Sequence, residues 1–320
     1  MPAIEIEKLI KQYKNGVKAL NGLSLRVNSG EIFSLLGPNG AGKSSLINIL
    51  TTFYKPTAGK VSMLGRDLCK EPAWVRTQIA CVAQRISIDA HLSLMENMMF
   101  QSRLYQVDAQ VAKKRTAALI DSFELAGYLK YPTASYSGGV KRRLDIAMNM
   151  VSSPKILFLD EPTVGMDIES RQAMWKMLLQ IRDEYGTTIF LTTHYLEEAD
   201  QLSDSICIMK DGRELAQGTP GSLRSYTGQN MLRIAFSSAG ETEKYKDILA
   251  GMGHIQFTRV RDHSVFVGVD DSRAAFTTVN KWLLEHQVGF DAIEIVEPSL
   301  EDVFLTLTGS GENREEQWLC

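Results

Sequence analysis

The chain alternates between short apolar runs and stretches in which apolar residues recur every three or four positions. Short runs with few charged side chains indicate strands that are buried on both faces. Runs of this kind are residues 32–36, 79–83, 155–159, 187–193 and 206–210. The stretches between them, such as residues 140–151, carry the apolar spacing of amphipathic helices. This alternation predicts an α/β domain.

The N-terminal residues follow a different pattern. Apolar and acidic side chains alternate over residues 4–7, as in a half-exposed strand. The pairs Asn21-Gly22 and Ser29-Gly30 are typical turn sequences, and they flank an apolar strand at residues 23–27. We therefore expect an antiparallel N-terminal sheet ahead of the α/β core.

A long helical stretch separates the second and third apolar runs and predicts a helical subdomain at about residues 87–150. Its first part is unusually apolar, with Leu92, Leu94, Met95, Met98, Met99, Phe100 and Leu104. A short insertion cannot easily bury that much surface by itself. Flexible methionines also suit a surface that must repack. Two interpretations remain open: these residues form the insertion's own core, or a helix of a partner protein packs on part of them.

The composition shifts at residues 221–229, which suggests a domain boundary. Beyond it we expect strands at 231–237, 254–260, 264–269 and 291–296, and helices at 241–251, 272–286 and 299–307. The order β-α-β-β-α-β, followed by a last helix, suits a small α+β domain of the ferredoxin-like type. The expected division is thus a first domain at 1–225, a second at 230–308 and a flexible charged tail at 309–320.

Composition narrows the class of protein. The net charge of −3 gives no electrostatic reason to expect nucleic acid as a partner. No run approaches the 18 apolar residues of a membrane-spanning helix, and the N-terminus lacks the apolar core of a signal peptide. The four cysteines are scattered, which fits a reducing compartment and argues against a zinc site.

The most informative stretch follows the first buried strand. Its residues are Gly37, Pro38, Asn39, Gly40, Ala41, Gly42, Lys43, Ser44 and Ser45, which match Gly-x-x-x-x-Gly-Lys-Ser. Between a strand and a helix, this motif is a phosphate-binding loop, because backbone N–H groups and the helix N-terminus cradle the phosphates. Lys43 is expected to reach the β- and γ-phosphates, and the Ser44 hydroxyl to bind Mg²⁺.

A second chemical signal ends the third apolar run. Asp160 and Glu161 are adjacent carboxylates at the edge of a buried strand, an arrangement that is costly without a nearby cation. We expect Asp160 to join the Mg²⁺ shell beside Ser44. Glu161 is placed to hold the attacking water.

With these motifs in one order, residues 3–225 resemble an ABC-transporter ATPase subunit. The matching positions are Tyr13 (adenine-stacking aromatic), 37–45 (Walker A), Gln84 (Q-loop), Ser137, Gly138 and Gly139 (signature), 156–161 (Walker B), Asp167 (D-loop) and His194 (switch histidine). The implied fold is a P-loop NTPase of ABC type, with a mixed-sheet core, an antiparallel N-terminal sheet and a helical subdomain. Glu297–Phe304 further resembles the daunorubicin-resistance branch, whose members pair with a separate membrane subunit.

The resemblance implies ATP hydrolysis with ATP and Mg²⁺ as cofactors. Ser44, Gln84 and Asp160 are the implied Mg²⁺ ligands, and Glu161, Gln84 and His194 the implied catalytic residues. In the family each signature faces the ATP of another subunit, so a second ATPase subunit is implied, either in a homodimer or as a close partner. An integral membrane permease is the other implied partner, docking beside Gln84 on residues 86–105. The chain would then act at the cytoplasmic face of the membrane and power an exporter.

Two positions depart from the family pattern. The D-loop is Val164-Gly165-Met166-Asp167 in place of the commoner Ser-Ala-Leu-Asp, with Asp167 kept. Val140 stands where the family usually has glutamine, although the daunorubicin-resistance branch commonly tolerates an apolar residue there. The adjacent basic run Lys141–Arg143 is expected to be a solvated helix start.

A soluble ABC ATPase acting in a non-transport complex is the alternative function. Against it, the chain has no sustained heptads of a repair-type coiled coil and only one ATPase domain.

Overall fold

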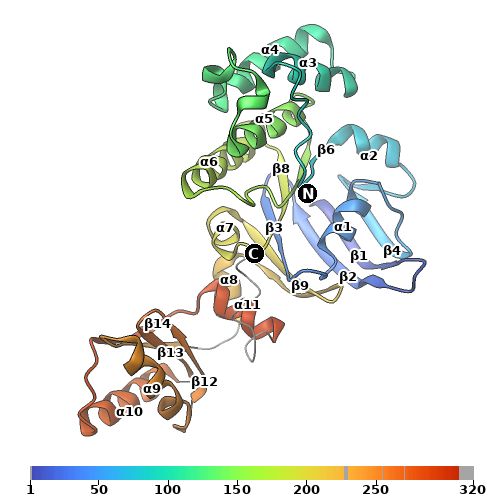
Figure 1. Cartoon of the computed structure of the whole chain (residues 1–320). Coiled ribbons are helices and arrows are strands. Elements are labelled where there is room, and N and C mark those ends of the chain that lie inside the picture. The colour runs from blue at the N-terminus through green and yellow to red at the C-terminus, as the bar shows by residue number, and fades with distance from the viewer. Residues whose placement is uncertain (1, 227–229, 254, 270, 310–320) are drawn as a thin grey trace. The chain divides into compact units, whose positions relative to one another are not determined.

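A computed structural model of the chain describes residues 2–226, 230–253, 255–269 and 271–309. The chain divides into two compact units, Met1–Pro220 and Gly221–Cys320 (Figure 1). Each unit has its own hydrophobic core. The predicted tail at residues 310–320 lies outside the described residues.

The centre of the first unit is a six-stranded sheet in the order β10-β9-β3-β8-β7-β6. Its strands are β3 (Ile32–Leu36), β6 (Ile79–Val82), β7 (Ile156–Asp160), β8 (Thr188–Thr193), β9 (Ser205–Lys210) and β10 (Arg213–Gly218). All neighbours are parallel except β10, which runs antiparallel to β9. Alternate residues of these strands enter two core clusters: Ile189 belongs to one, and Phe190 to the other. The expected mixed sheet is therefore buried on both faces.

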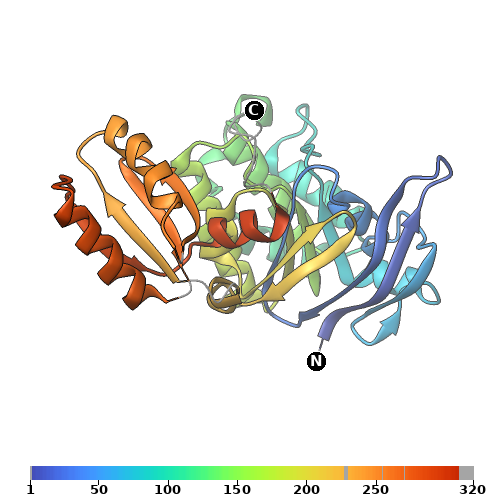
Figure 2. The same cartoon turned by 90° about the horizontal axis from the view of Figure 1, so that it is seen from below.

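The predicted antiparallel sheet is also present, with one local correction. Its order is β2-β1-β4-β5, with β1 (Pro2–Gln12), β2 (Lys18–Asn28), β4 (Ala58–Met63) and β5 (Arg66–Asp67). Figure 2 shows β1 and β2 as a long hairpin. The pair Asn21-Gly22 lies inside β2 and is not a turn, because Gly22 (φ 82°) is an extra residue between the pairs Leu9–Leu23 and Ile10–Asn21. A β-bulge needs the same conformational freedom as a tight turn.

Helices cover the central sheet and form a subdomain at one end of the first unit (Figure 1). The subdomain contains α3 (Leu94–Leu104), α4 (Ala109–Ser122) and α5 (Gly138–Met150), with short 3₁₀ turns at Ala126–Tyr128 and Thr133–Ser135. The other helices of this unit are α1 (Lys43–Leu50), α2 (Pro72–Gln78), α6 (Ile168–Tyr185) and α7 (Leu196–Leu202). Helix α3 begins with a capping box of Ser93 and Glu96, so its start is fixed locally.

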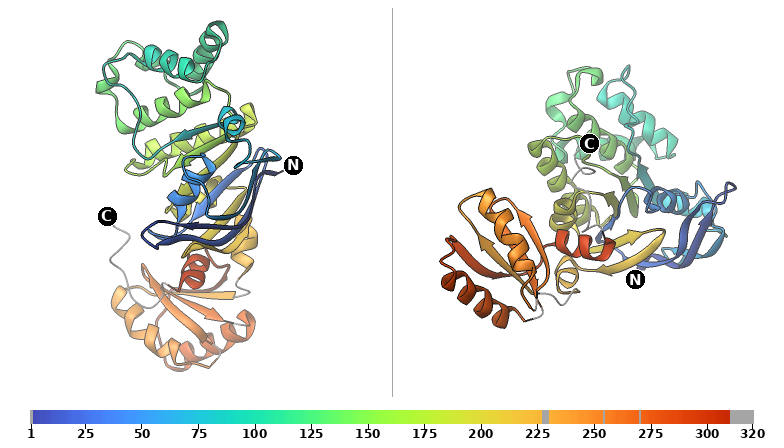
Figure 3. Two further views of the ribbon diagram at one scale, coloured as in Figure 1. Left: turned by 90° about the vertical axis from the view of Figure 1, so that its right-hand side faces the viewer. Right: turned by 60° about the horizontal axis from the view of Figure 1, so that its bottom comes forward.

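The second unit has the predicted β-α-β-β-α-β order. Its elements are β11 (Asn230–Ala235), α9 (Ala239–Ala250), β12 (Ile255–Arg261), β13 (Ser264–Val269), α10 (Ser272–Glu285) and β14 (Ala292–Val296), preceded by α8 (Pro220–Tyr226) and followed by α11 (Leu300–Thr308). The strands form an antiparallel sheet in the order β12-β13-β11-β14. Helices α9 and α10 lie on the same face of it (Figure 3) and share its core through Leu249 and Leu283.

Candidate functional site

The phosphate loop connects β3 to α1, and its backbone requires glycine. Gly42 has φ 107°, and a Cβ built there would lie 2.4 Å from the carbonyl oxygen of Ala19. Gly42 is the N-cap of α1 and supplies no side-chain capping bond. The N–H groups of the helix's first turn are therefore left for an outside acceptor, as at anion-binding helix N-termini.

Lys43 places a positive charge inside this loop. Its Nζ donates hydrogen bonds to the carbonyl oxygens of Gly37 (2.5 Å) and Pro38 (3.1 Å), and the residue is 8% exposed. Burial lowers the pKa of Lys43, while the nearby carboxylates of Glu161 and Asp160 act in the opposite direction. The lysine charge thus lies between the loop and the acidic strand end, where the predicted γ-phosphate belongs.

Tyr13 lies beside the end of the loop. Its hydroxyl shares a hydrogen bond of 2.9 Å with the Ser45 hydroxyl, and its ring meets Tyr54 edge-on at 5.9 Å. The Lys11 ammonium lies 5.3 Å from the Tyr13 ring centre. An aromatic face held this close to the phosphate loop suits the predicted stacking of a base.

The three predicted catalytic residues are in contact. Gln84 Nε2 donates a 3.1 Å hydrogen bond to Glu161 Oε2, and His194 Nδ1 lies 3.5 Å from Glu161 Oε1. Each residue follows the C-terminal end of a parallel strand: β6, β7 and β8 respectively. Because the carboxyl ends of parallel strands meet at one edge of the sheet, this topology brings together side chains that are distant in sequence.

The backbone of Glu161 is in a rare conformation. Its φ of 46° lies in the left-handed region, which costs a non-glycine residue roughly 1–3 kcal/mol. Its N–H donates to the carbonyl oxygen (3.1 Å) and the hydroxyl (3.2 Å) of Thr192 on the neighbouring strand. Such strain persists only where the surroundings enforce it, which is typical of functional positions.

The residues predicted to bind Mg²⁺ have suitable donor atoms. The Asp160 carboxylate accepts a 2.6 Å hydrogen bond from Thr192 Oγ1, which fixes its orientation. Ser44 is exposed, and Gln84 directs its amide nitrogen at Glu161, which leaves its oxygen for a cation. No group of three or more acidic, histidine or cysteine side chains that could hold a metal ion occurs among the described residues. Mg²⁺ usually needs only one or two carboxylates when substrate phosphates complete its shell, so the set fits.

The signature residues lie at the start of α5. Ser137 is the N-cap, and its hydroxyl accepts a hydrogen bond from the Val140 N–H at 3.3 Å. Ser137 and Gly138 are exposed, whereas Val140 is 5% exposed and packs in the core. An apolar residue is thus accommodated here because its side chain faces the protein interior.

Asp167, the predicted D-loop residue, caps the start of α6. Its carboxylate accepts hydrogen bonds from the Ser170 N–H and hydroxyl, both at 2.8 Å. These bonds, the backbone one first, lower the pKa of Asp167. A Cβ on Gly139 would lie 2.9 Å from Ser170 Oγ, so the signature lies close to the first turn of α6, which Asp167 caps.

The prediction that the basic run Lys141–Arg143 is a solvated helix start is wrong for Arg142. Arg142 is 3% exposed and lines a pocket of about 140 Å³ together with Gln84 and Glu161, so it is not part of a solvated helix start. Burial lowers its pKa, opposed first by Asp145. The sequence contains an indication of this burial, because Arg142, Asp145 and Asn149 have the spacing of residues on one face of a helix. All three are buried in α5.

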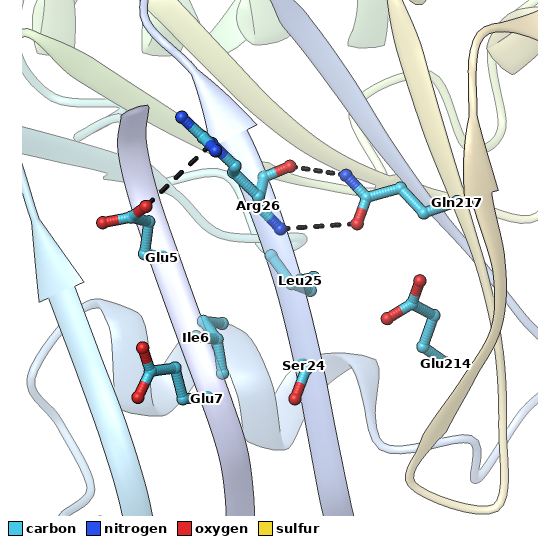
Figure 4. A pocket seen from close by; sticks show the side chains of 8 residues that line it. All are labelled: Glu5, Ile6, Glu7, Ser24, Leu25, Arg26, Glu214 and Gln217. Atoms are coloured by element: carbon cyan, nitrogen blue, oxygen red, sulfur yellow. Dashed lines mark hydrogen bonds and ion pairs between the residues drawn. The ribbon is translucent and has the colours of Figure 1, made fainter. Parts of the chain in front are cut away.

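A larger hollow, of about 320 Å³, contains none of the predicted nucleotide-binding residues (Figure 4). Three glutamates line it: Glu5, Glu7 and Glu214. Arg26 Nε lies 4.0 Å from Glu5 Oε1, and the Gln217 amide pairs with the Arg26 backbone. Three carboxylates against one guanidinium oppose the binding of a polyphosphate, so this hollow is not the candidate site.

Similarity to known proteins identifies the family of this chain. The family model described as ABC transporter matches residues 20–164. The chain is 39% identical over 308 residues to the daunorubicin/doxorubicin resistance ATP-binding protein DrrA of Streptomyces peucetius, covering 96% of this chain and 92% of that protein. The chain belongs to the ABC transporter family. It is also 32% identical over 308 residues to the Nod factor export ATP-binding protein I of Rhizobium sp. (strain N33), covering 96% and 97%.

Solved structures give the same assignment. The cbiO1 protein of Clostridium perfringens, described as part of the ABC transporter complex cbiONQ, matches with a TM-score of 0.66 and 28% identity over 71% of this chain and 92% of that one. The dimeric ATP-binding cassette MJ0796, bound to ADP and Pi after hydrolysis, matches with a TM-score of 0.59 and 25% identity over 68% and 98%. The predicted family and the P-loop NTPase fold of ABC type are thereby confirmed. This ABC family member is an ATPase that powers transport.

Proposed function

We propose that this chain is the ATPase subunit of an ABC exporter whose membrane-spanning permease is a separate protein. The observation that carries the proposal is the contact of Glu161 with Gln84 and His194 beside the phosphate loop. Relatives named for drug resistance and Nod factor export support the outward direction. Among the described residues, no helix combines the length and apolarity needed to cross a bilayer.

In this proposal the loop residues bind ATP and the strand ends hydrolyse it. The backbone of residues 37–45 and the Lys43 ammonium bind the phosphates, while Tyr13 stacks on adenine. Ser44, Asp160 and Gln84 hold Mg²⁺, which neutralises charge on the β- and γ-phosphates when bound. Glu161 orients the attacking water or accepts its proton, and His194 contacts the γ-phosphate. Preorganised charge and positioning supply most of the catalysis in this class of reaction.

A homodimer completes the nucleotide site in this proposal. Ser137 and Gly138 are exposed at a helix N-terminus, where an anion is favoured, and they are free to face a second chain. ATP held between two chains then joins them, and its hydrolysis releases them. A ligand shifts such an equilibrium only through its different affinity for the two states, and the γ-phosphate supplies that difference.

We narrow the proposed permease-docking surface to the exposed part of residues 86–105. Ile86, Met95, Phe100 and Leu104 are 40%, 41%, 53% and 62% exposed, whereas Leu94 and Met98 are fully buried in the core. Phe100 and Leu104, which lie one turn apart on α3, are the docking surface of this proposal. A helix of the permease is the proposed occupant, which would place the chain at the cytoplasmic face of the membrane.

The second unit is assigned a regulatory or dimer-supporting role. It has its own sheet and core and carries none of the nucleotide-binding motifs. Its charged pairs, such as Arg259–Asp302 at 2.7 Å, join its own elements.

The proposal is tested by purifying the tagged chain from membranes of its native host in mild detergent. Stoichiometric recovery of one multi-spanning membrane protein, with ATPase activity that Glu161→Gln abolishes, supports it. If the chain remains active but is recovered without a membrane protein, the proposed assembly with a separate permease is wrong.

A further inference from the structure

The guanidinium of Arg142 binds backbone on both sides of the catalytic glutamate. Nη2 donates to the carbonyl oxygen of Asp160 at 2.9 Å, and Nε donates to that of Pro162 at 3.2 Å. These two residues are the immediate neighbours of Glu161. Arg142 therefore binds the peptide group that directly precedes Glu161 and the one that follows Pro162, one on each side of the residue with φ 46°.

The same guanidinium also binds the residue that precedes Gln84. Nη1 donates to the carbonyl oxygen of Ala83, so one side chain joins the segments that carry Gln84 and Glu161. The side chains of those two residues are themselves hydrogen-bonded at 3.1 Å. The relative position of the catalytic pair is thus fixed both directly and through Arg142.

Asp145 completes this connection one turn along α5. Its carboxylate lies 3.8 Å from Arg142 Nη1, and both side chains are almost fully buried. It accepts hydrogen bonds from the Ser87 hydroxyl (2.5 Å) and N–H (3.4 Å). The segment from Ala83 to Ser87, with Gln84 inside it, is therefore held at both ends by one helix.

We propose that Arg142 is a positioning residue for ATP hydrolysis: from helix α5 it sets the placement of Gln84 and Glu161. The inference rests on the catalytic roles proposed above for those two residues. Helix α5 begins at Ser137-Gly138-Gly139, so a force applied at the signature acts on the helix that holds both catalytic segments. When the signature binds the ATP of a second chain, α5 therefore connects that contact to Gln84 and Glu161 of the chain that carries the signature.

Arginine is suited to this task for a chemical reason. Its planar fork presents five N–H donors in fixed directions, whereas lysine offers one nitrogen on a flexible stem. Arg142→Lys keeps the charge opposite Asp145 but cannot bind three separated carbonyl oxygens. This variant therefore separates the positioning role from the need for a buried positive charge.

The test compares Arg142→Lys and Ser87→Ala with the matched control Arg143→Lys. Arg143 is the next residue of α5, but its guanidinium binds the Phe123 carbonyl oxygen and Glu124 in the helical subdomain. For each variant the full-length protein is assayed for kcat and KM for ATP, for affinity toward the fluorescent analogue TNP-ATP, and for thermal unfolding. Glu161→Gln is assayed in parallel.

We expect Arg142→Lys to lower kcat about 10- to 100-fold, because displacing a catalytic group by about 1 Å can cost on the order of 100-fold. Its KM and TNP-ATP affinity should stay within about twofold of wild type. Ser87→Ala should show a smaller loss of the same kind, and Arg143→Lys none. The inference is wrong if Arg142→Lys hydrolyses ATP like Arg143→Lys, or if its kcat falls only together with nucleotide affinity and melting temperature. If Glu161→Gln itself turns over normally, the proposed function fails, whatever the Arg142 variants do.

Discussion

Glu161 and His194 lie 3.5 Å apart, at the ends of the neighbouring strands β7 and β8. The contact joins Glu161 Oε1 to His194 Nδ1, while Glu161 Oε2 receives the hydrogen bond from Gln84. Both carboxylate oxygens of Glu161 are therefore in contact with another residue of the site. A water held by Glu161 would lie within reach of His194. Substitution of either residue is therefore expected to impair ATP hydrolysis rather than ATP binding.

Lys43→Ala and Ser44→Ala are expected to weaken ATP binding. Lys43 carries the positive charge inside the phosphate loop, and Ser44 supplies the proposed Mg²⁺ hydroxyl, so both act on the bound ground state. A loss of about 10-fold or more in affinity corresponds to roughly 1.4 kcal/mol for each interaction removed. Titration with TNP-ATP in the presence of Mg²⁺ measures it. Retention of wild-type affinity in both variants would refute the assignment of the loop.

His194→Ala is expected to show the opposite behaviour. ATP affinity should stay within about twofold of wild type, whereas kcat should fall on the order of 100-fold, the lower end of the range for a catalytic acid–base group. Equilibrium binding and steady-state ATPase assays on one preparation separate the two quantities. Loss of affinity equal to that of Lys43→Ala would show that His194 serves ground-state binding.

Phe100→Glu and Met98→Glu are expected to differ although they lie on the same helix. Phe100 is 53% exposed, so the charge should leave the isolated subunit folded and prevent assembly with the permease. Met98 is fully buried, and a carboxylate there should unfold the helical subdomain. Circular dichroism and co-purification give the two readouts. If Phe100→Glu also unfolds the subunit, or assembles normally, the docking surface lies elsewhere.

Removal of the second unit, leaving residues 1–220, is expected to preserve ATP binding. The phosphate loop, the catalytic strand ends and the signature all lie in the first unit. TNP-ATP titration of the truncated chain, with its folding checked by circular dichroism, tests this. A folded truncation without nucleotide affinity would assign the second unit a direct part in the site.

The fold and the main motifs could be predicted because local sequence determines them. The phosphate loop requires glycines whatever surrounds it, and the buried strands are readable as apolar runs. The pair Asn21-Gly22 predicts a turn but forms part of a bulge, since a bulge and a turn need the same residue types and only strand pairing separates them. Met95 and Met98 are equally apolar, and only the packing of α3 decides which is buried.

The burial of Arg142 shows a further limit of sequence interpretation. Three consecutive basic residues at a helix start suggest exposure to solvent, yet the middle one is buried. It donates hydrogen bonds to carbonyl oxygens at the ends of β6 and β7. Those carbonyl groups reach it only through the tertiary arrangement of strands far apart in sequence. Helical spacing with Asp145 and Asn149 indicates a buried polar stripe, but it does not identify what the stripe binds.

The most direct test of the account is Glu161→Gln. The amide keeps the shape of the side chain but cannot accept a proton, so ATP should bind with near wild-type affinity. Turnover should fall about 10²- to 10⁴-fold, equivalent to roughly 3–5 kcal/mol of barrier. With ATP and Mg²⁺ this variant should elute from a sizing column as a dimer that wild-type protein forms only transiently. Normal turnover in Glu161→Gln, or a variant that hydrolyses nothing and stays monomeric with bound ATP, would contradict the account.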